Sequence, residues 1–145
     1  MSLLMFHATT NHSKQILDIL VLLITGGGKY HEDTVETWSP TDGASCSLPN
    51  MIRPRHDHTI SGGLVCGDFS FGPVTRSCEV WRAETGQWEE VVTNLTDERH
   101  GHVSWTDPEG TTFIMGGHGA YFSVETISKD YTVAPASFSL EHSRA

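Results

Sequence analysis

Short apolar runs that end in glycine recur three times along the chain. They read LLITGGG at 22–28, GLVCGD at 63–68 and TFIMGG at 112–117. A second run of β-type residues follows each of them: TVETW at 34–38, SCEVW at 77–81 and SVETI at 123–127. Runs this short, rich in Val, Ile, Thr and Trp and bounded by turn residues, predict β-strands instead of helices.

An arginine–histidine motif precedes the second and third of these runs and recurs at a regular interval. RPRHDH at 53–58 holds Arg55 and His58, and DERHGH at 97–102 repeats them 44 residues later as Arg99 and His102. A glutamate recurs near the same interval, as Glu36, Glu79 and Glu125. A period of this size, made of short strands and turns, is typical of β-propeller blades.

Each unit predicts four strands. In the middle unit we expect them at His58–Ser61, Leu64–Cys66, Ser77–Arg82 and Trp88–Val92. The second strand ends at glycine because a Cβ would clash there or because φ must be positive. The glycines in this role are Gly26, Gly27, Gly67, Gly116 and Gly117. Residues 15–28 are too short to span a membrane, so we expect a buried strand leading into a turn.

These residues resemble the kelch repeat. The resemblance rests on ITGG, VCGD and IMGG, on the Arg-x-x-His lead-in and on the later Trp88, and it covers about residues 20–130. The cysteine-bearing segments SCSLP, LVCGD and SCEVW are similar to those of invertebrate kelch proteins. The resemblance implies an all-β, incomplete kelch β-propeller of about two and a half four-stranded blades, near 20–50, 55–94 and 99–130.

The two ends of the chain are expected to be different. Residues 1–19 carry no period and predict a poorly structured leader, and residues 131–145 resemble the stretch that leads towards a further blade. Closed propellers use four to eight blades, and blades without neighbours expose apolar faces. We therefore expect a fragment of a longer propeller, or a chain that needs further kelch blades or self-association for closure.

The recurring polar residues predict a structural framework. His56-x-His58 and His100-x-His102 have a spacing that suits a metal on one strand face, but recurrence at the blade spacing favours a packing role. We expect each arginine to pair between blades with a carboxylate such as Glu36 or Glu79, and the tryptophans, Trp105 included, to fill the inter-blade core. The framework residues are Arg55, His58, Arg99, His102, Glu36, Glu79, Glu125, Trp38, Trp81 and Trp88.

No catalytic motif accompanies the repeat. The sequence has no phosphate-binding loop, Gly-x-Ser-x-Gly or paired carboxylates, so we expect no enzyme, no metal and no cofactor. Galactose oxidase is in the kelch superfamily, but nothing places a cysteine beside Tyr30, Tyr121 or Tyr131 for its copper site. A net charge of −9 without a basic stripe argues against nucleic acid, and we expect no membrane partner.

Recognition is expected in the loops that vary between units. They are GKYHEDT at 28–34, DFSFGPVTRS at 68–77 and HGAYFS at 118–123. Their candidate binding residues are Tyr30, His31, Phe69, Phe71, Tyr121 and Phe122. Because varied loops on a constant scaffold often carry recognition, we expect a protein-interaction scaffold with protein partners. The alternatives are an extracellular carbohydrate-binding or adhesive module and a fragment of a galactose-oxidase-like enzyme.

The three cysteines indicate in which cellular compartment the protein is found. Cys66 ends a second strand and Cys78 opens the third strand of the same hairpin, so we expect a disulfide between them, with Cys46–Cys66 as the other pairing. A disulfide favours an extracellular over a cytoplasmic location. Asn94, in Asn-Leu-Thr, is the candidate glycosylation site.

Overall fold

The protein is all-β in the computed structural model, which describes residues 2–10, 17–25, 33–68 and 74–136. Within these ranges there are twelve strands and no helix. It follows that no helix capable of crossing a membrane occurs in them.

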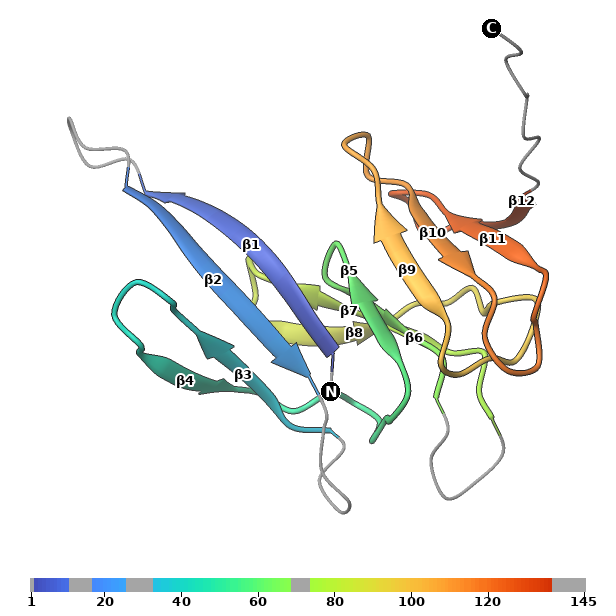
Figure 1. Ribbon diagram of the computed structural model, residues 1–145, viewed down its shortest axis with the longest axis horizontal. Coiled ribbons are helices and arrows are strands. Elements are labelled where there is room, and N and C mark those ends of the chain that lie inside the picture. Colours follow the sequence, from blue (N-terminus) through green and yellow to red (C-terminus); the bar gives the residue numbers. More distant parts are fainter. Residues whose placement is uncertain (1, 11–16, 26–32, 69–73, 137–145) are drawn as a thin grey trace, which may run out of the picture.

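The strands form three open antiparallel sheets of four strands each, one after another along the chain (Figure 1). The first contains β1 (Ser2–Thr10), β2 (Leu17–Thr25), β3 (Val35–Trp38) and β4 (Ser45–Leu48). The second contains β5 (Thr59–Ser61), β6 (Leu64–Cys66), β7 (Cys78–Arg82) and β8 (Gln87–Glu90). The third contains β9 (Val103–Thr106), β10 (Thr112–Met115), β11 (Val124–Ile127) and β12 (Val133–Ala136). Each sheet is a meander, since its strands pair in chain order.

Two segments differ from the expectation. Residues 2–10, expected as a poorly structured leader, form β1 and pair with β2 from Ser2↔Thr25 to Thr10↔Leu17. Within the tail, Val133–Ala136 forms β12, the fourth strand of the third sheet, paired with β11. In both strands the backbone N–H and C=O groups pair with those of a neighbouring strand. Such pairing does not require a repeated sequence motif, which is why the sequence pattern did not predict it. The structure thus has three complete four-stranded sheets where two and a half were expected.

The hydrophobic core lies between the sheets, in two layers. One layer joins the first and second sheets and contains Leu23, Val35, Met51, Ile60, Val65 and Trp88. The other joins the second and third sheets and contains Leu64, Cys66, Cys78, Val80, Val91, Leu95, Ile114 and Ile127. Successive residues of β6 supply both layers because neighbouring side chains of a strand point to opposite faces. The second sheet is therefore buried on both sides.

The first strands of the sheets also contact one another. β1 contacts β5, and β5 contacts β9. Thr106 of β9 lies under the β5–β6 turn, where its Oγ1 is 2.8 Å from Oγ of Ser61. The sheets are thus joined along their first strands as well as through their faces.

The tryptophans are not all in the core, contrary to expectation. Trp88 is buried and Trp81 is half-buried beside it, with ring centroids 5.5 Å apart. Trp38 is 37% exposed and Trp105 is 54% exposed. They lie in the first and third sheets, each of which has a neighbouring sheet on one face only among the described residues, whereas the second sheet has two.

Candidate functional site

A buried arginine holds the two ends of the β6–β7 connection together. Arg55 donates from Nη1 to the carbonyl oxygens of Gly67 and Ser77, both at 3.0 Å, and from Nη2 to Oγ of Ser77 at 2.9 Å. Its Nε donates to Oε1 of Glu79 at 2.8 Å. Gly67 directly follows β6 and Ser77 directly precedes β7, so one guanidinium fixes the base of this loop.

The same arrangement recurs in the third sheet. Arg99 donates to the carbonyl oxygen of Gly116 at 3.0 Å and to Oγ of Ser123 at 2.7 Å. It also forms an ion pair with Glu125. Gly116 directly follows β10 and Ser123 directly precedes β11, so Arg99 fixes the base of the β10–β11 connection as Arg55 fixes that of β6–β7.

The glutamates extend each network to the chain that joins successive sheets. Glu79 accepts hydrogen bonds from the backbone N–H groups of Ile52 and Arg53, at 2.7 and 3.1 Å. Glu125 accepts the corresponding bonds from Thr96 and Asp97, at 2.6 and 3.4 Å. Each buried carboxylate thus has an arginine and two backbone N–H groups as partners, which compensate for its removal from water.

The expected ion pair between an arginine and Glu79 is present, but it lies within one four-stranded unit, whereas a pair between two units was expected. Arg55 and Glu79 belong to the same four-stranded unit, so the pair does not join two blades. Arg99 and Glu125 likewise share a unit. Glu36 is exposed, and its carboxylate has no ion pair within the ranges that the structure describes.

Two histidines also bridge neighbouring sheets. Nε2 of His58 lies 2.9 Å from Oγ1 of Thr25, and Nε2 of His102 lies 2.8 Å from Oγ1 of Thr59. Each bond joins a histidine just before a first strand to the preceding sheet. Burial lowers the pKa of His58 to about 3 and that of His102 to about 4, and the nearby charges of Arg55 and Arg99 act in the same direction. Both imidazoles are therefore neutral near pH 7.

The paired histidines do not converge on one point. His58 is directed to Thr25, whereas His56 and His100 place their Nδ1 atoms 3.8 and 3.9 Å from Oδ2 of Asp57. Among the residues with described positions, no group of three or more His, Cys, Asp or Glu side chains is arranged to hold a metal ion.

The glycines after the second strands lie where successive units meet. Gly67 has φ +69°, and a Cβ there would lie 2.4 Å from the carbonyl oxygen of Arg99. Gly117 has φ +92°, and its Cβ would lie 2.7 Å from the carbonyl oxygen of His100. Gly116 also has positive φ, at +63°. These three positions need glycine for conformation or for space. Gly26 and Gly27 are outside the described residues.

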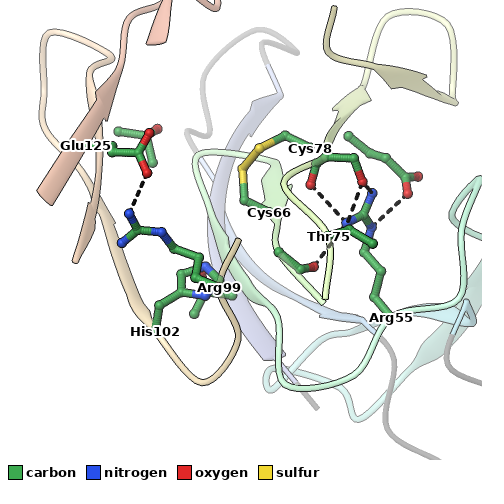
Figure 2. Close-up of a disulfide and its surroundings, with 12 residues drawn as sticks. Arg55, Cys66, Thr75, Cys78, Arg99, His102 and Glu125 are labelled. Carbon is green, nitrogen blue, oxygen red and sulfur yellow. Dashed lines mark hydrogen bonds and ion pairs between the residues drawn. A yellow bond between two sulfur atoms is a disulfide. The ribbon is translucent and has the colours of Figure 1, made fainter. Parts of the chain in front are cut away.

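The expected disulfide is confirmed. Cys66 and Cys78 are directly opposite in the β6–β7 ladder, with Cα atoms 4.2 Å apart, and their sulfurs are bonded. Figure 2 shows the bond between the Arg55 network on one side and the Arg99–Glu125 pair on the other. Cys46 is an exposed free cysteine, so the alternative Cys46–Cys66 pairing is wrong.

The β10–β11 connection presents aromatic side chains to solvent. Tyr121 is 63% exposed and Phe122 is fully exposed, while Ala120 beside them is buried. His118 stacks on His100 with centroids 5.0 Å apart and meets the edge of Tyr121 at 5.4 Å. The candidates Tyr30, His31, Phe69 and Phe71 lie outside the described residues. Asn94 is exposed.

The two serines that accept hydrogen bonds from the arginines were not predicted from the sequence. Ser77 and Ser123 each stand two positions before the paired glutamate, so Ser-x-Glu is a repeated signal that was available. Thr25 and Thr59 were not predicted either, because they bind the two histidines from different strand positions and share no local sequence pattern.

The chain matches no protein-family model, and no curated protein matches its sequence.

Proposed function

We propose that the protein is a kelch-type β-propeller scaffold that binds other proteins through the loops between its second and third strands and has no catalytic activity. The observation that carries the proposal is the arginine at the base of each loop. Arg55 and Arg99 each bond to residues at both ends of a connection, Gly67 and Ser77 in one case and Gly116 and Ser123 in the other.

This arrangement separates framework from loop sequence. An arginine, a glycine and a serine close the loop in both units. The segments that they enclose differ in length and sequence, and comprise residues 68–76 in one unit and 117–122 in the other. A loop whose ends are held by buried hydrogen bonds can change its sequence without disturbing the strands. Framework of this kind suits recognition of partners by varied loops.

The exposed aromatics of the β10–β11 loop support protein binding. Phe122 is fully exposed and Tyr121 lies next to it. Large aromatic side chains bury much apolar area and supply many of the strongest contacts in protein interfaces. Two adjacent ones, next to Ser123 at the fixed base of the loop, form a small anchor that a partner can cover.

The repeated polar residues are poorly placed for catalysis. Arg55, Glu79 and Arg99 have no exposed surface, and each bonds to backbone groups, to a serine or to its own ion-pair partner. A catalytic acid or base must reach a substrate atom within hydrogen-bond distance. These side chains do not meet solvent, so their chemistry is used within the fold.

The test is binding by a loop variant. Proteins captured by the wild-type chain from its source are identified, and the affinity of a purified candidate is measured by calorimetry. We expect Tyr121→Ala/Phe122→Ala to bind at least about tenfold more weakly, as loss of hot-spot aromatics does. Val92→Ala, at another fully exposed apolar position, is the control and should bind as the wild type does.

Two results would overturn the proposal. One is equal binding of a partner by wild type and loop variant when thermal melts show both folded. The other is binding to a glycan array that the loop variant loses, which would assign the loop to carbohydrate recognition.

A further inference from the structure

A cavity of about 190 Å³ lies between the second and third sheets. Leu64 and Ile127 line it from the core layer between these sheets, and Thr106, Lys129 and Tyr131 line it from strand ends and turns. Figure 1 shows the β5–β6 and β9–β10 turns at the same end of the molecule. Because each sheet is a meander, this end is opposite the β6–β7 and β10–β11 connections. The cavity is therefore separate from the proposed binding loops.

The size of the cavity suits a molecule with one six-membered ring. An engineered cavity of about 150 Å³ with apolar walls takes up benzene in another protein. At about 190 Å³, this cavity has space for such a ring and a small polar substituent. Leu64 and Ile127 are 4% and 1% exposed and form an apolar wall on which the ring can pack.

A chain of three hydroxyl groups borders the cavity. Oγ1 of Thr106 lies 2.8 Å from Oγ of Ser61 and 2.8 Å from Oγ1 of Thr112. Thr106 and Thr112 both line the cavity. Three hydroxyl groups carry three protons, and the two bonds between them use two. One proton is therefore left for an acceptor outside the chain.

Tyr131 and Lys129 add hydrogen-bond donors at the cavity. The phenol oxygen of Tyr131 accepts from Nη1 of Arg82 at 2.8 Å, which leaves its own proton to donate. Lys129 is exposed, and its ammonium group has no ion pair within the part of the chain that the structure describes. Its side chain starts beside Gly110, where an added Cβ would lie 3.5 Å from Cβ of Lys129. No carboxylate lines the cavity among the described residues.

We propose that this cavity binds a small organic carboxylate, with its apolar part against Leu64 and Ile127 and its carboxylate at Lys129. A lysine ammonium group and O–H groups are donors, and a carboxylate accepts from both. A neutral ligand would leave the ammonium group without a counter-charge, and a cation would be repelled by it. The site goes beyond the proposed function, since it takes a small molecule at the end of the sheets opposite the binding loops.

Benzoate is the probe, because it joins one aromatic ring to one carboxylate, and benzamide is its neutral isostere. Titration of each into isotope-labelled protein at pH 7, followed by amide chemical shifts, gives both dissociation constants. We expect benzoate to shift the amide signals of Thr106, Thr112 and Tyr131. It should bind at least about fivefold more tightly than benzamide, as a hydrogen bond to a charged group contributes.

Variants of the lysine test the role of its charge. Lys129→Met should remove the preference for benzoate over benzamide, whereas Lys129→Arg should keep it. Arg53→Met is the matched control, because it also removes one positive charge but from an exposed pair with Glu90 that does not line the cavity. It should leave benzoate binding unchanged. Thr112→Val keeps the shape of the side chain without its hydroxyl and should weaken binding in protein that thermal melts show to be folded.

Three results would overturn the inference. The first is the absence of shifts at Thr106, Thr112 and Tyr131 with millimolar benzoate. The second is equal binding of benzoate and benzamide. The third is unchanged binding of benzoate by Lys129→Met. Shifts confined to the β10–β11 connection would also refute the site, because they would place the probe at the opposite end of the sheet.

Discussion

Arg55 and Glu79 form an ion pair with no exposed surface on either side chain, and Nε of the arginine lies 2.8 Å from Oε1 of the glutamate. Removing two charges from water costs several kcal/mol for each, which is recovered only when both are fully hydrogen-bonded. Here the arginine also binds Gly67 and Ser77, and the glutamate also binds two backbone N–H groups. The pair is thus stable as a unit, and one member without the other is a buried, uncompensated charge.

Arg55→Met should therefore lower the free energy of unfolding by about 3–5 kcal/mol, the usual cost of breaking a buried pair. Urea denaturation followed by circular dichroism measures it. The matched control is Arg53→Met, which breaks the exposed pair with Glu90, whose side chains are 54% and 52% exposed, and should cost less than about 1 kcal/mol. Equal losses in the two variants would show that burial of the Arg55 pair has no special role.

Gly67→Ala should destabilise the protein by about 3 kcal/mol. Positive φ alone costs an L-residue about 1–2 kcal/mol, and crowding of a packed site adds about 1–3 kcal/mol. The new Cβ would lie 2.4 Å from the carbonyl oxygen of Arg99. Gly86→Ala separates the two effects, because Gly86 has φ +65° and open space around its Cβ position. Thermal melts that rank the two variants equally would contradict the close approach at Gly67.

Loss of the disulfide should cost about 3 kcal/mol, from the chain-entropy estimate for a loop of 12 residues. Cys66→Ala/Cys78→Ala should show this loss with or without reductant, and the wild type should match it only when reduced. Cys46→Ala, at the exposed free cysteine, should change stability little. Non-reducing mass spectrometry of protein from its native compartment gives the direct check: three free thiols would contradict the bond and the oxidising location that it favours.

The buried histidines should make the protein less stable as the pH falls from about 6.5 towards 4. Their folded pKa values, about 3 for His58 and about 4 for His102, lie below the ordinary 6.5. Between these values the unfolded chain takes up protons that the folded chain refuses, so the stability present above pH 6.5 is lost on acidification. Each histidine contributes at most about 1.4 kcal/mol per pH unit. Denaturation midpoints across this range should vary less in His102→Gln, and an unchanged slope would refute its role.

The strands of the middle unit were predictable because their signals are local. β6 has the predicted bounds, Leu64–Cys66, and the other three strands differ by one or two residues at their ends. Short runs of β-type residues between turn residues are recognised from neighbours in sequence alone, and β5 and β6 are in addition each followed directly by a glycine. The Cys66–Cys78 bond was predictable for the same reason, since both cysteines belong to one hairpin.

The sequence alone therefore determined the all-β class, the disulfide and the arginines, histidines and two of the glutamates of the buried networks, but not the serines and threonines that bind them. Only the tertiary structure decided that Arg55 pairs within its own unit, that His58 and His102 bridge units, and that β1 and β12 complete their sheets. It also decided that Trp88 is buried while Trp105 is exposed, although both are large aromatics on short strands. The physical reason is that pairing and burial depend on which sheet lies opposite a side chain, and no periodicity within one unit specifies its neighbour.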